Sequence, residues 1–288
     1  MTMPDNMMAR NAAESGIGAG RSRGYPLGDK LTAAIDRLRA LDRIVNEPYL
    51  PVASPPIDPA DLGAWLAGQA AERRTHGETV AEARVWQGPA VAALVASYRE
   101  LVPGWTAKLV TEFAGAVAAF AAVAETAPAV LTAASDDDQV AAYRAVLTAA
   151  GTLDRLAATR TQIGGSIAEQ GAGSLLAVAE VPPLPGDPGA LNDAWPDLHA
   201  ALGHMRMPAG VDGWRGLLAA QTTGIVVSMA GAGGIQSRSD RLDSWRSWTS
   251  VVNTSAGGTQ RYTTAMAAGR TAYATGPRTT AAAGRTSR

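Results

Sequence analysis

The sequence predicts a mostly α-helical protein: an antiparallel helical bundle as the core, a smaller helical C-terminal module, and flexible N- and C-terminal arms. Three observations predict this fold. Alanine, the best helix former and a poor strand former, makes up roughly one residue in five. Apolar residues recur every three or four positions through the middle of the chain, which is helical spacing. Glycine, proline and polar residues without such periodicity fill both ends.

The composition excludes several classes of protein. The chain has 288 residues, a net charge of −1 and no cysteine, so it has no disulfide scaffold, thiolate nucleophile or cysteine-based metal site. No run approaches the 18 or so apolar residues of a membrane span. The N-terminus lacks the apolar core of a classical signal peptide. We therefore expect a protein that is cytoplasmic at synthesis and has no membrane span.

The charge composition points to protein partners. Charged residues make up 18% of the chain, against about 25% in average domains, and a low charged fraction favours buried partner surfaces. Lysine occurs only at Lys30 and Lys108, and arginine supplies the other basic residues. A composition rich in alanine and arginine and poor in lysine is typical of a GC-rich genome, and it indicates no function.

The helical core is expected over residues 30–180. Residues 1–29 are rich in glycine and polar residues and are predicted to form a flexible arm. Apolar residues at helical spacing predict a first helix over 30–45. Prolines between Pro48 and Pro59 then predict an extended crossover.

The next part of the core is expected to consist of short helices. A helix beginning near Pro59 is predicted to kink or turn at Gly88-Pro89 and to break at Pro103-Gly104. A further helix is expected from about Trp105 to Thr126. Such short breaks make neighbouring helices pack antiparallel.

The last helix of the core opens with a capping signal. Ser135 with Asp138 three residues later resembles a capping box. Arg155 and Arg160 in the predicted last turn suit the negative end of the helix dipole, and Gly164-Gly165 is predicted to close the helix. We expect Trp86, Trp105 and Tyr143 to be core residues.

The C-terminal part divides into a linker, a module and a tail. Four prolines and two glycines predict a linker at 181–189. Helical pieces are expected within a module over 190–252, with one strand-like stretch at Gly224–Ile235. Residues 253–288 contain no acidic residue and no Val, Ile or Leu beyond Val252, so they are predicted to form a basic flexible tail.

The arginines near the C-terminus are candidate contacts for a protein partner or for nucleic acid. Tyr262 and Tyr273 lie among them and could stack on bases. Their charge density is low, so we favour a tail that solubilises or packs on a partner over a nucleic-acid contact. The candidate residues are Arg246, Arg261, Arg270, Arg278, Arg285 and Arg288.

No catalytic, metal or cofactor residue is predicted. His199 and His204 are five apart, whereas two ligands on a helix are three or four apart, and His76 stands alone. Asp136–Asp138 lack the spacing of a calcium loop and suit the first turn of a helix. No phosphate loop and no nucleophile elbow occur. We therefore expect a non-enzymatic protein without cofactors.

One stretch leaves a nucleotide-binding alternative open. Gly224–Gln236 resembles the strand and glycine turn of dinucleotide-binding folds, in which Gly231, Gly233 and Gly234 would approach a pyrophosphate. The third glycine of that fingerprint is replaced by Gln236, and no second parallel strand is evident. We favour a flexible turn or an assembly contact at this place.

Trp86-Gln87-Gly88, with helical sequence on both sides, is similar to the Trp-x-Gly turn of small helical hairpins exported by type VII secretion systems. The similarity covers about residues 59–127. It implies a secreted helical effector that binds a partner hairpin. Pro103-Gly104 interrupts the second helix of that pattern, and no Tyr-x-x-x-Asp/Glu export signal follows.

A second similarity covers more of the chain. Residues 78–162, with VASYRELVPGWTAKLVTEFAGAVAAFAAVAE followed by QVAAYRAVLTAAGTLDRLAATR, resemble uncharacterised helical proteins encoded beside head and tail genes of actinobacterial phages. This resemblance implies a structural or assembly role in a virion, without catalysis. Self-association, or arms that order on neighbouring subunits, is the expected mode of action.

Overall fold

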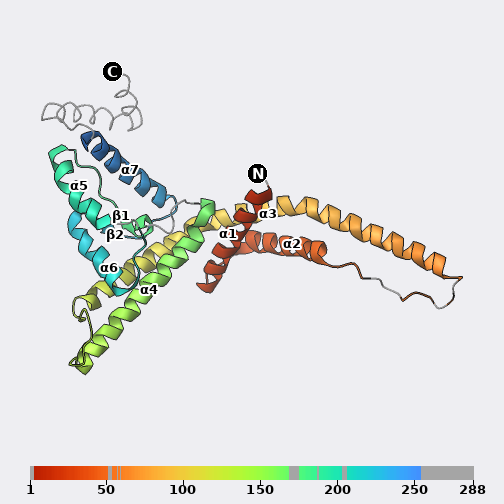
Figure 1. The fold of residues 1–288 in the computed structure, drawn as a ribbon, viewed down its shortest axis with the longest axis horizontal. Coiled ribbons are helices and arrows are strands. Elements are labelled where there is room, and N and C mark those ends of the chain that lie inside the picture. Colours follow the sequence, from red (N-terminus) through yellow and green to blue (C-terminus); the bar gives the residue numbers. More distant parts are fainter. Residues whose placement is uncertain are drawn as a thin grey trace, which may run out of the picture. The chain divides into compact units, whose positions relative to one another are not determined.

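The computed structural model describes residues 3–50, 54–56, 58, 60–168, 175–186, 188–202 and 206–253. Over these residues the chain forms seven α-helices, two short 3-10 helices and two strands of two residues each (Figure 1). The prediction of a mostly α-helical fold is confirmed. The chain divides into two compact units, residues 1–103 and 104–288.

The first unit contains α1 (Met3–Ser22), α2 (Gly28–Asn46) and the beginning of α3 (Leu62–Ala124). Two side-chain contacts fix α2 antiparallel to α3. Lys30 Nζ lies 3.1 Å from Glu100 Oε2 near the start of α2. Gln87 Nε2 donates to Asp42 Oδ1 at 2.9 Å near its end. The core between these helices is built from buried aliphatic side chains and one tyrosine: Ile17, Leu31, Ile35, Leu38, Val91, Leu94, Val95, Tyr98 and Val102.

Residues 3–22, which the sequence predicts as part of a flexible arm, instead form α1. Ala13, Ile17 and Ala19 are buried on one side of this helix. Gly16 and Gly20 are buried as well. Tertiary packing thus outweighs the low helix propensity of glycine. Gly24, at φ +71°, adopts the left-handed conformation just beyond the end of the helix.

The breaks predicted at Gly88-Pro89 and Pro103-Gly104 are absent, because α3 continues through both prolines. Each proline removes one backbone hydrogen bond and frees the carbonyl four residues earlier. Pro89 and Pro103 are exposed, and so are Val85 and Arg99, the residues four positions earlier. Water can hydrate a freed carbonyl on an exposed face, so the helix continues at a lower cost than in a dry core.

The second unit contains the rest of α3 together with four further helices and a small two-stranded sheet. Its strands, β1 (Ala179–Glu180) and β2 (Val226–Val227), pair antiparallel, with Ala179 opposite Val227. The 3-10 helices are η1 (Leu175–Ala177) and η2 (Ala220–Thr223). The helices are α4 (Asp137–Ala168), α5 (Pro188–Leu202), α6 (Gly210–Ala219) and α7 (Gly234–Asn253). The three helical pieces predicted for this part of the chain correspond to α5, α6 and α7.

The core of the second unit is arranged around Trp214. Its indole ring lies 5.9 Å from the Phe113 ring, measured between centroids, and its Nε1 donates to Asp154 Oδ1 at 2.8 Å. The neighbouring Arg215 donates to the carbonyls of Ala124 (3.3 Å) and Ala127 (2.9 Å). Helix α6 therefore fastens α4 to the C-terminal end of α3.

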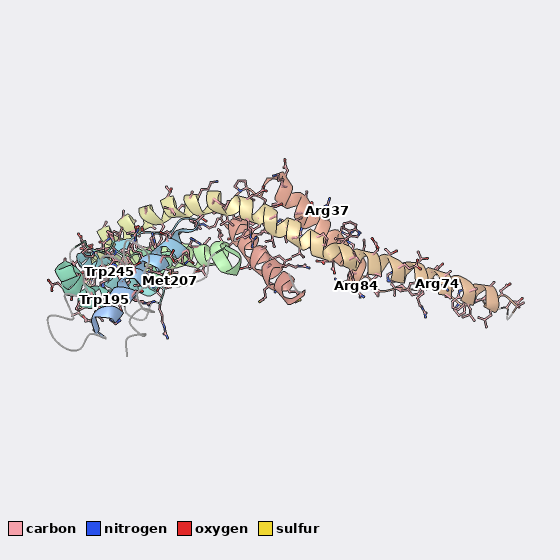
Figure 2. All side chains as sticks on the ribbon, turned by 90° about the horizontal axis from the view of Figure 1, so that it is seen from above. Arg37, Arg74, Arg84, Trp195, Met207 and Trp245 are labelled. Atoms are coloured by element: carbon pink, nitrogen blue, oxygen red, sulfur yellow. The ribbon has the colours of Figure 1, made fainter. Side chains whose placement is uncertain are left out.

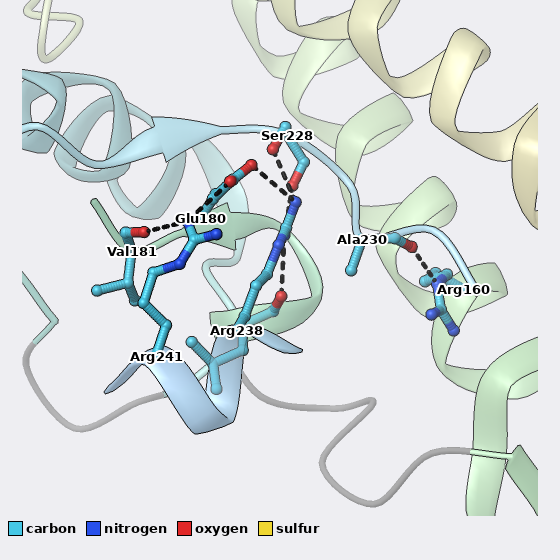
Figure 3. A network of polar contacts seen from close by, with 8 residues as sticks. Arg160, Glu180, Val181, Ser228, Ala230, Arg238 and Arg241 are labelled. Atoms are coloured by element: carbon cyan, nitrogen blue, oxygen red, sulfur yellow. Dashed lines mark hydrogen bonds and ion pairs between the residues drawn. The ribbon is translucent and has the colours of Figure 1, made fainter. Parts of the chain in front are cut away.

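Arginines of α4 and α7 hold the two-stranded sheet and the turn after β2 (Figure 3). Arg238 is buried and donates to the carbonyls of Leu176 and Ser228, at 3.0 and 2.8 Å. Arg241 Nη1 donates to Glu180 Oε1 and to the Val181 carbonyl, both at 2.9 Å. These bonds satisfy carbonyls that a two-residue ladder leaves without a strand partner.

The predicted linker at 181–189 lies inside the second unit. Val181 is buried, and the Pro182 carbonyl accepts a hydrogen bond from Trp245 Nε1 at 2.9 Å. The boundary between compact units lies within α3 instead. A run of prolines marks the absence of regular structure, but it does not show whether the segment is packed. The described residues end at Asn253, so the predicted basic tail lies outside them.

Helix α4 begins with a capping box one residue later than predicted. Asp136 Oδ1 accepts a hydrogen bond from the Gln139 backbone at 2.8 Å, and Gln139 Oε1 accepts one from the Asp136 backbone at 3.3 Å. Ser135 Oγ instead accepts from the Thr132 backbone in the preceding turn. Helix α4 also continues past Gly164-Gly165 to Ala168, so Arg160 lies in its interior and not in its last turn.

Candidate functional site

An exposed apolar surface of the first unit lies on α3. Val85 and Trp86 are 67% and 55% exposed. We call this surface, with the exposed residues that continue it along one helix face, the α3 outer face: Val85, Trp86, Pro89, Ala92, Ala93 and Ala96. Their separations are those of neighbours on one side of a helix. Leu94 and Tyr98 on the opposite side are buried in the core.

Charged residues border the α3 outer face at both ends. Glu78 and Glu82 precede it, and Arg99 and Glu100 follow it. Trp86 Nε1 donates to Glu82 Oε1 at 2.9 Å. Trp86 remains 55% exposed although it makes this bond. An apolar centre with charged ends is the usual anatomy of a protein interface.

The N-terminal part of α3, residues 62–82, contains no buried residue. Leu62 and Leu66 are 39% and 54% exposed. The chain before α3 supplies one support, because Tyr49 lies against this stretch. A helix of about 20 residues without tertiary packing is marginal in water, so this part of α3 would be stabilised by a partner.

Tyr49 makes several contacts with this part of α3. Its hydroxyl donates to Gln69 Oε1 at 2.9 Å. Its ring lies 5.7 Å from the His76 ring and 5.6 Å from the Arg73 guanidinium. Partial desolvation, followed by the nearby Glu72 carboxylate, raises the pKa of the Tyr49 phenol above its usual value of 10.0. These contacts hold the chain before α3 against the N-terminal part of that helix.

The residues considered for metal or acid–base chemistry are dispersed. His76 lies beside Tyr49, His199 lies 5.3 Å from the Trp195 ring, and His204 is outside the described residues. Trp195 in turn stacks on Trp245, with 5.9 Å between the ring centroids. Within the described part of the chain, no three His, Asp or Glu side chains are grouped so as to hold a metal ion. Asp136 caps α4, as described above.

The glycine turn proposed for a nucleotide has a structural contact instead. Arg160 is fully buried, and its Nε and Nη2 donate to the carbonyls of Ala230 (2.9 Å) and Gly231 (3.1 Å), as Figure 3 shows for Ala230. The strand before the turn, β2, pairs antiparallel with β1. A dinucleotide fold requires a parallel sheet there, and the described residues contain no parallel pair of strands.

The structure describes only one of the six candidate arginines. Arg246 is exposed on α7 and lies 3.5 Å from Asp243. Arg261, Arg270, Arg278, Arg285 and Arg288 lie outside the described residues.

Two of the tryptophans predicted as core residues differ in position. Trp105 is buried, at 2% exposure, but Trp86 is on the surface, and Tyr143 is half-buried. Trp86-Gln87-Gly88 lies in the middle of α3, so the turn implied by the Trp-x-Gly similarity is absent. Trp86 is on the surface because this part of α3 is apolar on all sides, whereas α1 and α2 cover only one side of it.

The sequence contains a signal for the α3 outer face that our prediction missed. Residues 85–96 are apolar at positions that fall on opposite sides of one helix. A helix that is apolar all round is buried in a larger assembly or in a membrane. The predicted kink or turn at Gly88-Pro89 divides this segment between two helices. The apolar residues on its two sides then do not stand out as belonging to one helix.

Helix α3 is also long and apolar enough to cross a membrane, by length and composition alone. Its most apolar 18 residues have a mean hydropathy of 1.6, and 17% of them are buried. Core helices of soluble proteins meet the same criterion. Comparison of the chain with protein-family models, curated proteins and solved structures found no match.

Proposed function

We propose that the protein is a non-enzymatic assembly component that associates with further copies of itself through the α3 outer face. The observation that carries the proposal is the exposure of six apolar residues on one face of a helix whose other face already belongs to a core. Removing this surface from water is favourable in proportion to its apolar area. The exposed N-terminal part of α3 supports the proposal, because it too lacks a packing partner.

The α3 outer face is complementary to itself in size. Its larger side chains, Val85 and Trp86, stand at one end, and the small Ala92, Ala93 and Ala96 stand at the other. In an antiparallel pair centred between residues 90 and 91, Val85 is level with Ala96 of the second copy. Pro89 is then level with Ala92. Large side chains therefore meet small ones, as ridge-and-groove packing of helices requires.

The face is also complementary to itself in charge. In the same antiparallel arrangement, Glu82 of one copy is level with Arg99 of the other. A two-fold axis repeats this pair at both ends of the contact, which is the property of an isologous interface. A parallel arrangement would place Glu82 beside Glu82 and lose the pair. A protein surface is favoured over lipid because alanine and proline contribute little transfer free energy but permit close packing.

The particle in which such an assembly would act is proposed from the resemblance of residues 78–162 to phage helical proteins. Within a phage-like head or tail, a helical component that pairs through one face could join neighbouring subunits. The self-association itself does not depend on this setting and is tested separately.

Light scattering over a range of concentrations measures the self-association. We expect the full chain to form a defined dimer or larger oligomer, and Ala93→Glu to shift the equilibrium to the monomer, because it places two carboxylates in each interface. Ala33→Glu, on the exposed side of α2, is the matched control and keeps the wild-type mass. A wild-type chain that stays monomeric, or an Ala93→Glu variant that associates normally, would overturn the proposal.

Cross-linking distinguishes the antiparallel arrangement from a parallel one. The chain has no cysteine, so a single introduced cysteine is the only thiol. Ala92→Cys is near the proposed two-fold axis and should cross-link to itself with a short bismaleimide. Ala71→Cys would be separated from its copy by about 58 Å at 1.5 Å per residue and should not. A parallel pair would cross-link at both positions. A membrane-bound protein would instead sediment with vesicles.

A further inference from the structure

A pocket of about 240 Å³ opens between α1 and α2 in the first unit. Its floor is apolar and consists of Ile17 from α1, Ile35 and Leu38 from α2, and Leu94 from α3, which are all buried. The α2 residues that line it recur at helical spacing, so a continuous side of that helix faces the opening. The pocket lies within one compact unit and does not involve the α3 outer face.

The polar residues of the pocket fall into two groups. Arg10 donates to both carboxylate oxygens of Asp42, at 3.2 and 2.6 Å, and its Nε donates to Glu14 at 2.9 Å. The Asp42 hydrogen bond is the largest contribution to the raised pKa of Arg10. Asp42 also accepts from Gln87. Both acidic groups of the lining are thus engaged by an arginine that is itself part of the wall.

Two further arginines stand at the rim. Arg21 and Arg39 line the pocket and are exposed. Among the described residues, the side chain of neither arginine makes a hydrogen bond or an ion pair. The lining contains three arginines, Glu14 and Asp42, so its net charge is one positive unit, and that charge is located at the rim above the apolar floor.

We propose that this pocket binds a small monocarboxylate with a short aliphatic chain. The guanidinium groups of Arg21 and Arg39 would hold the carboxylate, because their planar donor pairs match its two oxygens. The aliphatic chain would cover the Ile17, Leu38 and Leu94 floor. The volume is below the roughly 300 Å³ at which pockets for drug-sized ligands begin. Inorganic phosphate is disfavoured, because it has no aliphatic chain to cover that floor.

Gly18 offers a way to close the pocket without touching its charges. This glycine lines the pocket, and a Cβ atom built on it would meet nothing within 4 Å. In Gly18→Leu the new side chain would occupy the open space. Leucine is also the better helix former, so α1 stays folded in this variant.

Isothermal calorimetry with hexanoate tests the proposal on the full chain, with hexylamine and 1-hexanol as probes of the charge requirement. We expect saturable binding of hexanoate, none of hexylamine, and much weaker binding of hexanol. Gly18→Leu should abolish binding of hexanoate. The double variant Arg21→Gln/Arg39→Gln should weaken it at least about tenfold, the usual effect of losing a charge-assisted hydrogen bond.

Arg37→Gln is the control for charge, because Arg37 is an exposed arginine of α2 that does not line the pocket (Figure 2). It should bind hexanoate as the wild type does. Absence of hexanoate binding to the wild type would overturn the proposal, as would unchanged binding to Gly18→Leu or equal binding of hexylamine. Because calorimetry measures the ligand directly, these outcomes do not depend on whether α3 mediates self-association.

Discussion

Asp154 of α4 and Trp214 of α6 are joined by a hydrogen bond of 2.8 Å between the carboxylate and the indole Nε1. The same carboxylate lies 3.2 Å from the backbone nitrogen of Gly210, the first residue of α6. One side chain therefore holds the buried indole and compensates the positive end of the α6 dipole. The contact joins residues 60 positions apart.

We predict that Asp154→Ala destabilises the protein by roughly 2–4 kcal/mol, because a buried indole N–H and the start of a helix both lose their acceptor. Urea unfolding followed by tryptophan fluorescence measures this. Asp197→Asn, at an exposed position of α5, is the control and should change stability by less than about 0.5 kcal/mol. A similarly small effect of Asp154→Ala would contradict the role assigned to the carboxylate.

Arg160→Met is predicted to destabilise the second unit by roughly 2–4 kcal/mol. The methionine keeps much of the side-chain volume, but the carbonyls of Ala230 and Gly231 lose their buried donor. Hydrogen exchange at the start of α7 should accelerate as well, since the turn before that helix is no longer fixed. Arg155→Met, at an exposed position of the same helix, provides the comparison. Unchanged exchange in Arg160→Met would show that the turn is held by other contacts.

Local signals predicted much of the fold, because the physics behind them is local. The apolar spacing of residues 30–45 predicted α2, which spans Gly28–Asn46. Acidic and polar residues near Asp136 predicted the start of α4 to within one or two residues. The helical pieces expected after residue 190 correspond to α5, α6 and α7. In each case, a residue and its neighbours three or four positions away determine the outcome.

The differences arose where distant residues decide the structure. Glycines in α1 indicated a loop, but the packing of Ile17 against α2 and α3 stabilises a helix there. Arg160 was assigned to the end of a helix, whereas its partners are about 70 positions away in the chain. The pocket between α1 and α2 was not predicted for the same reason, since one of its walls was expected to be a flexible arm.

Replacing Pro103 should test whether α3 is one continuous helix. In an uninterrupted helix, Pro103→Ala restores the backbone N–H at position 103 and removes the proline ring from the preceding turn, so we expect stabilisation of roughly 1–3 kcal/mol. Thermal unfolding followed by circular dichroism is the measurement. Ala107→Gly, an exposed position one turn later, should have the opposite sign and cost about 1 kcal/mol. If α3 turned at Pro103 instead, Pro103→Ala would be neutral or destabilising.

The phenol of Tyr49 is predicted to titrate above pH 10.0, because partial desolvation and the Glu72 carboxylate both disfavour the phenolate. The folded protein thus prefers the protonated phenol more than the unfolded chain does. The contribution of Tyr49 to stability is therefore fully present below the unfolded pKa and is lost as the pH rises through the folded pKa.

Carbon-detected NMR of the Tyr49 ring measures the titration directly. Glu72→Gln should lower the pKa of Tyr49 part of the way towards 10.0, since the desolvation remains. Glu78→Gln, six residues further along α3, should leave that pKa unchanged. A Tyr49 that titrates at or below 10.0 in the wild type would show that the chain before α3 does not rest on the helix in solution.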